Sequence, residues 1–96
     1  MFKNRNSDGK NNFCGKQVRL LRLSSVPKLS QRALAEKLQL LGLDVDKNAV
    51  QRIESGQRFV TDIELIALQS VFNVPFERLL KTEKDLSSFP YQKKDN

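Results

Sequence analysis

The stretch SQRALAEKLQLLGLDVDKNAVQRIESG, residues 30–56, decides the fold of this chain. Its apolar residues recur three and four positions apart, a spacing that predicts amphipathic helices over 31–41 and 47–55. Ser30 and Asp46 precede these helices, where a side-chain oxygen can accept a hydrogen bond from an unpaired backbone N–H. The stretch therefore predicts two short, separately capped helices that follow each other closely along the chain.

The flanking sequence predicts three more helices. Apolar residues at helical spacing indicate helices over 14–24, 62–72 and 76–81. The first of these must end before Pro27, because the residue that precedes a proline disfavours the helical backbone. Thr61 stands three residues before a glutamate and predicts a capping box for the helix over 62–72. No segment alternates as a strand does, so the expected fold class is all-α, a compact five-helix bundle.

Glycine and asparagine mark where the expected helices stop. Gly42 and Gly56 can adopt the left-handed backbone that ends a helix, and Asn73 stands at the end of 62–72. The helix over 62–72 has too many apolar residues for one narrow stripe. We therefore expect it to be the most buried helix of the bundle.

Length and composition indicate one domain. The chain has 96 residues, 39% of them hydrophobic, which suffices for one core but not for two. Residues 1–12 are expected to form a flexible basic arm, residues 13–82 the folded domain, and residues 83–96 a polar tail. No apolar stretch approaches the roughly 20 residues needed to cross a bilayer, and the first residues lack the apolar centre of a secretion signal. We therefore expect a cytoplasmic protein. No helix is both strongly basic and strongly amphipathic, as a helix lying on a membrane surface would be, so we expect no membrane partner and keep membrane binding only as a minor third alternative.

Cysteine and histidine content argues against metal and catalytic chemistry. The chain has no histidine and a single cysteine, Cys14, so the usual zinc ligand sets and the commonest general base are absent. Cys14 is better explained as a small buried hydrophobe than as a lone nucleophile. Nothing in the spacing of carboxylates such as Asp44 and Asp46 forces them into one cleft. We expect no enzyme, no metal site and no cofactor.

The helix expected over 47–55 has two chemically different faces. At about 100° per residue, its apolar residues fall on one half of the helix. The other half is a polar strip without an acidic residue, composed of Lys47, Asn48, Gln51, Arg52 and Ser55. Side chains of these types can read base edges, Arg or Lys at guanine and Asn or Gln at adenine. The net charge of +6 also favours polyanions, although the strip taken alone fits an ordinary solvated face.

The segments LSQRALAEKL and VDKNAVQRIESG, residues 29–38 and 45–56, resemble the Cro and phage-repressor type of helix-turn-helix protein, the XRE family. That family joins a Ser-Gln-x-x-Leu-Ala helix to one that ends Ile-x-x-Ile-Glu-x-Gly. The later DIELIALQSVFNVPFERLL, residues 62–80, looks like the fourth and fifth helices of the family. The resemblance implies a DNA-binding domain of the lambda-repressor-like type.

The resemblance also implies roles for single positions. The groove-facing positions of the recognition helix, which would read bases, are Lys47, Asn48, Gln51 and Arg52. Gln31 matches the position that holds a DNA phosphate, helped by backbone N–H groups at the start of its helix. We add Arg32 and Arg58 as phosphate candidates, with a solvated loop charge as the alternative for Arg58. Arg22 and Glu54 match a pair that forms a structural salt bridge.

Two function hypotheses follow. The first is a repressor-like transcription regulator that binds double-stranded DNA sequence-specifically, as a homodimer on half-sites roughly 34 to 36 Å apart. The second is a protein-interaction module, such as an antitoxin or adaptor, that binds a partner protein through its tails. Leu86, Phe89 and Tyr91 motivate it, although they could equally cover the protein's own core. The connection between Leu38 and Val45 is about five residues longer than in the family, which leaves the docking angle open.

Overall fold

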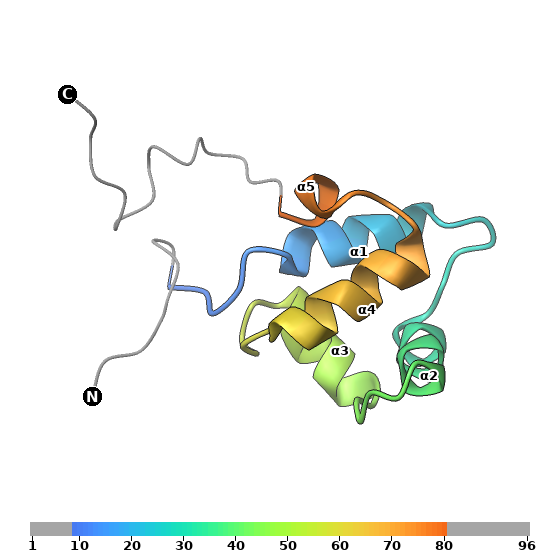
Figure 1. Cartoon of the computed structure of the whole chain (residues 1–96), viewed down its shortest axis with the longest axis horizontal. Coiled ribbons are helices and arrows are strands. Elements are labelled where there is room, and N and C mark those ends of the chain that lie inside the picture. The colour runs from blue at the N-terminus through green and yellow to red at the C-terminus, as the bar shows by residue number, and fades with distance from the viewer. Residues whose placement is uncertain (1–8, 81–96) are drawn as a thin grey trace.

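The computed structural model describes residues 9–80, which form five helices and no strand (Figure 1). The helices are α1 (Gly15–Ser24), α2 (Gln31–Leu40), α3 (Lys47–Glu54), α4 (Asp62–Phe72) and α5 (Phe76–Leu79). The all-α prediction is confirmed: α4 has the expected ends, and each of the other helices differs from the expected range at one end, by one or two residues. The difference at α2 and α3 arises because Leu41 and Ser55 are C-cap residues, whose N–H groups still donate to helix carbonyls.

The predicted caps are present at the start of the middle helices. The Ser30 hydroxyl accepts from the third residue of α2 at 2.9 Å, and the Asp46 carboxylate accepts from the third residue of α3 at 2.8 Å. Thr61 and Glu64 exchange both hydrogen bonds of the capping box, each at 3.2 Å. These bonds satisfy N–H groups that have no partner within the helix, and they determine where each helix begins.

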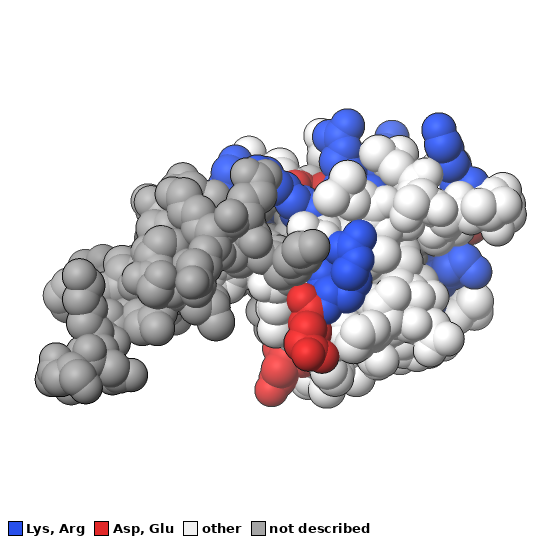
Figure 2. Space-filling view, turned by 90° about the horizontal axis from the view of Figure 1, so that it is seen from above, with Lys and Arg blue, Asp and Glu red and all other residues white. Residues whose placement is uncertain are grey.

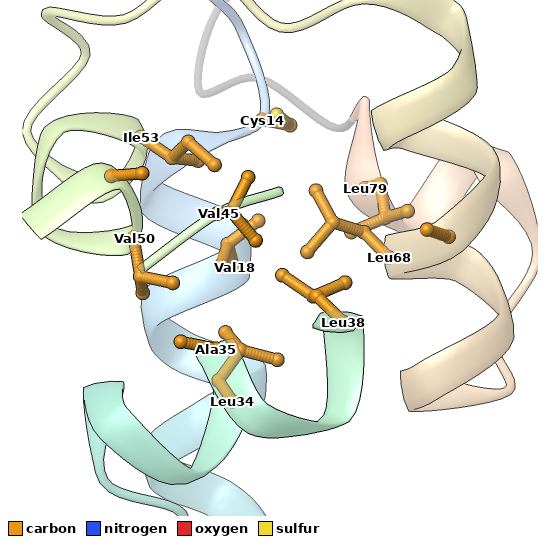
Figure 3. Packing of buried hydrophobic residues seen from close by; sticks show 12 residues of the cluster. Cys14, Val18, Leu34, Ala35, Leu38, Val45, Val50, Ile53, Leu68 and Leu79 are labelled. Carbon is orange, nitrogen blue, oxygen red and sulfur yellow. The ribbon is translucent and has the colours of Figure 1, made fainter. Parts of the chain in front are cut away.

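The core lies where all five helices meet. Helix α3 contacts both α1 and α2, α4 packs on α2, and α5 packs on α1. Figure 3 shows one side chain from each helix pointing toward a common centre, namely Val18, Leu38, Ile53, Leu68 and Leu79. Because α3 touches two other helices along its apolar side, its opposite side is left to face outward.

The expectation that α4 is the most buried helix is wrong. Only Ala67 and Leu68 of this helix are buried, whereas Ile63 and Ile66 are 65% and 55% exposed. The count of apolar residues was correct, but a bundle of this size has few elements with which to cover them. Among residues 9–80, α4 packs mainly on α2, and its outer side faces solvent.

The long connection between α2 and α3 is held by local hydrogen bonds. Gly42 has a φ of +94° and its N–H donates to the Gln39 carbonyl at 2.9 Å, while the N–H of Leu43 donates to the Leu38 carbonyl at 3.2 Å. The Gln39 side chain donates to the carbonyl of the buried Val45 at 2.7 Å. The extra residues are therefore an ordered end to α2 that leads directly to the cap of α3.

Candidate nucleic-acid interface

The side chains predicted to read bases lie together on the outer side of α3. These exposed side chains are Lys47, Asn48, Gln51 and Arg52. The opposite side consists of Ala49, Val50 and Ile53, each at most 3% exposed. The two faces expected from the helical period are therefore present, and burial of the apolar face leaves the polar strip on the outer side of α3.

The one acidic side chain of α3 is turned away from the strip. Glu54 accepts from Nε and Nη2 of Arg22 at 2.6 and 3.0 Å, and these side chains are 4% and 10% exposed respectively. Arg22 also donates through Nη1 to the carbonyl of Leu29 at 2.9 Å. The ion pair implied by the resemblance is thus present and ties α1 to α3. It also neutralises a charge that would otherwise repel a polyanion.

Gln31 adjoins this ion pair. Its side-chain Nε2 donates to Oε1 of Glu54 at 3.1 Å, and the residue is half-buried. The side-chain amide nitrogen of glutamine carries two hydrogens, so the bond to Glu54 uses one of them and the other can donate a second hydrogen bond. Gln31 therefore connects the start of α2 to the end of α3, a contact that the sequence did not indicate.

The two arginines added as phosphate candidates differ in their surroundings. Nε of Arg32 lies 3.9 Å from Oε2 of Glu36, and these side chains are 82% and 65% exposed. This ion pair is therefore weak, and Arg32 can readily exchange Glu36 for another anion. Arg58 donates through Nη2 to Oε2 of Glu64 at 2.8 Å, in a more enclosed position. Arg58 therefore fastens the loop after α3 to the start of α4, and only Arg32 stands on the surface as expected.

Sequence reasoning missed three residues that contact the carboxyl end of α3. We call Lys10, Asn11 and Asn12 the strap. All three were expected to belong to the flexible arm over residues 1–12, yet they donate hydrogen bonds to carbonyls at the end of α3 and in the loop that follows. Consecutive asparagines before a helix were the only local signal, and they do not specify a distant partner.

Predictions about residues 1–8 and 83–96, including Leu86, Phe89 and Tyr91, lie outside the described residues.

Basic side chains do not gather on the side of the molecule where α5 lies. Figure 2 views that side and shows separate Lys and Arg side chains with acidic ones close by and broad uncharged surface between them. A phosphate backbone is attracted by clustered positive charge. On the described part of this side, positive charge is therefore spread over separate side chains and is not gathered in one patch.

Cys14 packs as a core residue. It is buried, and this burial raises the pKa of its thiol from an ordinary value of 9.0 to about 11. A buried, protonated thiol is a poor nucleophile, which agrees with the packing role expected from the sequence.

Within residues 9–80, no group of three or more potential ligands lies where it could hold a metal ion. In the same part of the chain, every helix is too short or too polar to span a bilayer.

Comparison with protein families matches residues 27–79, more than half of the chain, to the family described as Helix-turn-helix. The chain therefore belongs to the helix-turn-helix family of the Cro/C1 type, the XRE family, a family of DNA-binding proteins. The matched residues include α2, the long connection and α3. Comparisons with curated proteins and with solved structures found no match.

Proposed function

We propose that this protein is a cytoplasmic, repressor-like transcription regulator that binds double-stranded DNA sequence-specifically and reads the major groove with α3. The observation that carries the proposal is the polar strip. Four side chains able to read base edges project from one side of a helix whose other side is buried. A helix of this width fits the major groove, where each base pair presents a distinct pattern of donors and acceptors.

The charges around α3 support the same proposal. Lys47 and Arg52 supply positive charge to the strip, while Glu54 is paired with Arg22. An unpaired carboxylate beside the strip would repel DNA phosphates and accept no hydrogen bond from them. Ion pairing therefore leaves α3 with an outer surface whose charged groups all favour a polyanion.

Contacts with phosphates are assigned to the start of α2 and to the loop after α3. Gln31 and Arg32 lie at the first turn of α2, where the helix dipole and unpaired N–H groups favour an anion. Arg58 would have to exchange its contact with Glu64 for a phosphate. Arg32 is the cleanest test, because Arg32→Ala removes no buried contact. It should weaken binding to all duplexes about equally and lower the slope of affinity against salt by about one.

Selection from a pool of random duplex DNA tests the proposal most directly. We expect the protein to enrich a defined sequence. Lys47→Ala and Arg52→Ala should each reduce the preference for that sequence over a scrambled duplex by about 1 to 3 kcal/mol. Arg19→Ala removes an arginine that is also exposed, but on α1, and serves as the matched control. If both α3 variants discriminate as well as the parent, α3 is not the reading helix.

We further propose that the protein binds as a homodimer. Such a dimer would place two copies of α3 on half-sites roughly 34 to 36 Å apart and would enrich a symmetric sequence. Exposed apolar side chains on α4 and α5, among them Ile66 and Phe76, offer surface that a second copy would cover. Analytical ultracentrifugation on the enriched duplex should find two chains per symmetric site, and one chain per site would refute the dimer.

A further inference from the structure

The strap lies across the carboxyl end of α3. The backbone N–H of Asn11 donates to the Gly56 carbonyl at 2.8 Å, and its side-chain amide donates to the Gln57 carbonyl at 2.8 Å. Lys10 donates through Nζ to the Ser55 carbonyl at 3.1 Å. Three consecutive carbonyls that follow α3 therefore each receive a donor from the strap.

Asn12 makes the contacts that reach furthest into the fold. Its Nδ2 donates to the carbonyls of Ile53 and Arg58, at 3.2 and 2.7 Å. Its Oδ1 accepts from the N–H of Gly15, the first residue of α1, at 2.8 Å. A Cβ at Gly15 would collide with the Ile53 carbonyl, so the start of α1 lies directly against the end of α3. One amide side chain thus joins the start of α1, the end of α3 and the loop beyond it.

These contacts matter because they fix the turn that ends α3. The last carbonyls of a helix have no partner within the helix, and together they carry a negative partial charge. With eight residues, α3 is also too short to be stable by itself. In α3 the N–H groups of the following turn, those of Ser55, Gly56 and Gln57, donate to the carbonyls of Gln51, Ile53 and Arg52. The strap adds a second donor at the Ile53 carbonyl and otherwise bonds to carbonyls of that turn, so it holds the turn that caps α3. The Lys10 ammonium also opposes the negative partial charge at this end of the helix.

We propose that Asn12 is a positioning residue for DNA reading, and that the strap sets the direction in which the polar strip points. This inference rests on the proposed function of α3. Hydrogen bonds weaken steeply when donor and acceptor are misaligned, and a bidentate contact with a base requires both bonds at once. A small rotation of the end of α3 therefore costs discrimination between sequences, while contacts with phosphates tolerate it.

Asn12→Asp separates the two roles of this side chain. The carboxylate keeps an oxygen for the Gly15 N–H but loses both donors to the carbonyls of Ile53 and Arg58. We expect the ratio of affinities for the enriched and scrambled duplexes to fall about tenfold, as expected for one weakened base contact. The added negative charge weakens binding to both duplexes and cancels in this ratio. Asn73→Asp makes the same change at the exposed end of α4 and should leave the ratio unchanged.

Amide hydrogen exchange in the protein without DNA distinguishes failure of this inference from failure of the proposed function. In Asn12→Asp we expect the N–H groups of Ser55 and Gln57, which bond to α3 carbonyls, to exchange at least about fivefold faster. The N–H of Val18 in α1 should be unchanged. A parent protein that enriches no sequence refutes the proposed function, whatever the exchange shows.

Two results would overturn the inference itself. Unchanged exchange at Ser55 and Gln57 would mean that the strap does not hold α3, and faster exchange with an unchanged affinity ratio would mean that it holds α3 without directing the strip. If Asn12→Asp does not fold, Lys10→Met removes one exposed donor from the strap and is measured in the same two ways. We expect it to lower the ratio about two- to threefold, because it removes only one of the contacts at a solvent-exposed position.

Discussion

The ion pair between Arg22 and Glu54 yields the sharpest stability prediction. Glu54→Ala removes the acceptor of three hydrogen bonds, two from Arg22 and one from Gln31. It leaves the nearly buried guanidinium with its hydrogen bond to the Leu29 carbonyl and without a carboxylate to compensate its charge. Removing one partner of a buried pair costs about 3 to 5 kcal/mol, because the other charge stays desolvated without compensation. We expect a loss of this size in the free energy of unfolding.

Urea unfolding followed by circular dichroism measures the loss. The free energy of unfolding of a small domain falls by about 1 to 1.5 kcal/mol for each molar of urea, so the urea midpoint should fall by about 2 to 5 M. Glu36→Ala is the matched control, because it breaks an exposed carboxylate–arginine pair with Arg32. That change should cost less than about 0.5 kcal/mol.

A double substitution tests the physical reason for this prediction. Arg22→Met with Glu54→Leu removes both charges and keeps apolar volume, so it should lie within about 1 kcal/mol of the parent. The reasoning would be refuted if Glu54→Ala cost less than about 1 kcal/mol, since that would show that water screens the pair. It would be equally refuted if the double variant were as unstable as the single one, since packing rather than charge would then explain the loss.

Three further predictions concern the core and the cap of α3. Burial raises the pKa of the Cys14 thiol to about 11, so the stability contributed by the protonated thiol is complete below about pH 9 and is lost as the pH rises toward 11. Between these pH values, urea unfolding should show that the free energy of unfolding falls by about 2 to 3 kcal/mol more in the parent than in Cys14→Ala. Asp46→Ala should cost about 0.5 to 2 kcal/mol in thermal unfolding through loss of the α3 cap, and the neighbouring Asp44→Ala should cost far less. Leu68→Ala should cost about 2 to 5 kcal/mol, whereas equal costs for Leu68→Ala and the exposed Ile66→Ala would contradict the assigned core.

The helices could be predicted because their signals are local. The caps at Ser30, Asp46 and Thr61 each bond to an N–H three residues later, so the residue types and their spacing contain the whole interaction. The left-handed φ of Gly42 and of Asn73 follows in the same way from local backbone preference. Boundaries shifted by a residue or two because the last turn of a helix shares its hydrogen bonds with the cap.

Contacts between distant segments could not be predicted in this way. Asn12 and Ile53 are 41 positions apart, and Gln17 accepts a hydrogen bond from Arg78 across 61 positions. No periodic pattern encodes which of several asparagines meets a particular carbonyl. The exposure of Ile63 also depends on distant segments. The sequence of α4 shows how many apolar side chains the helix has, but not which other elements are available to cover them.

The polar strip on α3 was predictable, but the contacts of Asn12 at the carboxyl end of this helix were not. The strip follows from the helical period, which determines that apolar and polar residues segregate to opposite sides. The direction of the helix axis depends on what holds each end: Asp46 and Val45 at the start, and Glu54 with Asn12 at the finish. Because α3 has only eight residues and little stability of its own, the proposed function predicts that substitutions at these residues change DNA discrimination although none of them contacts a base. Variants that alter discrimination should therefore fall into two groups, those in the strip that remove a base contact and those at the ends of α3 that redirect several contacts together.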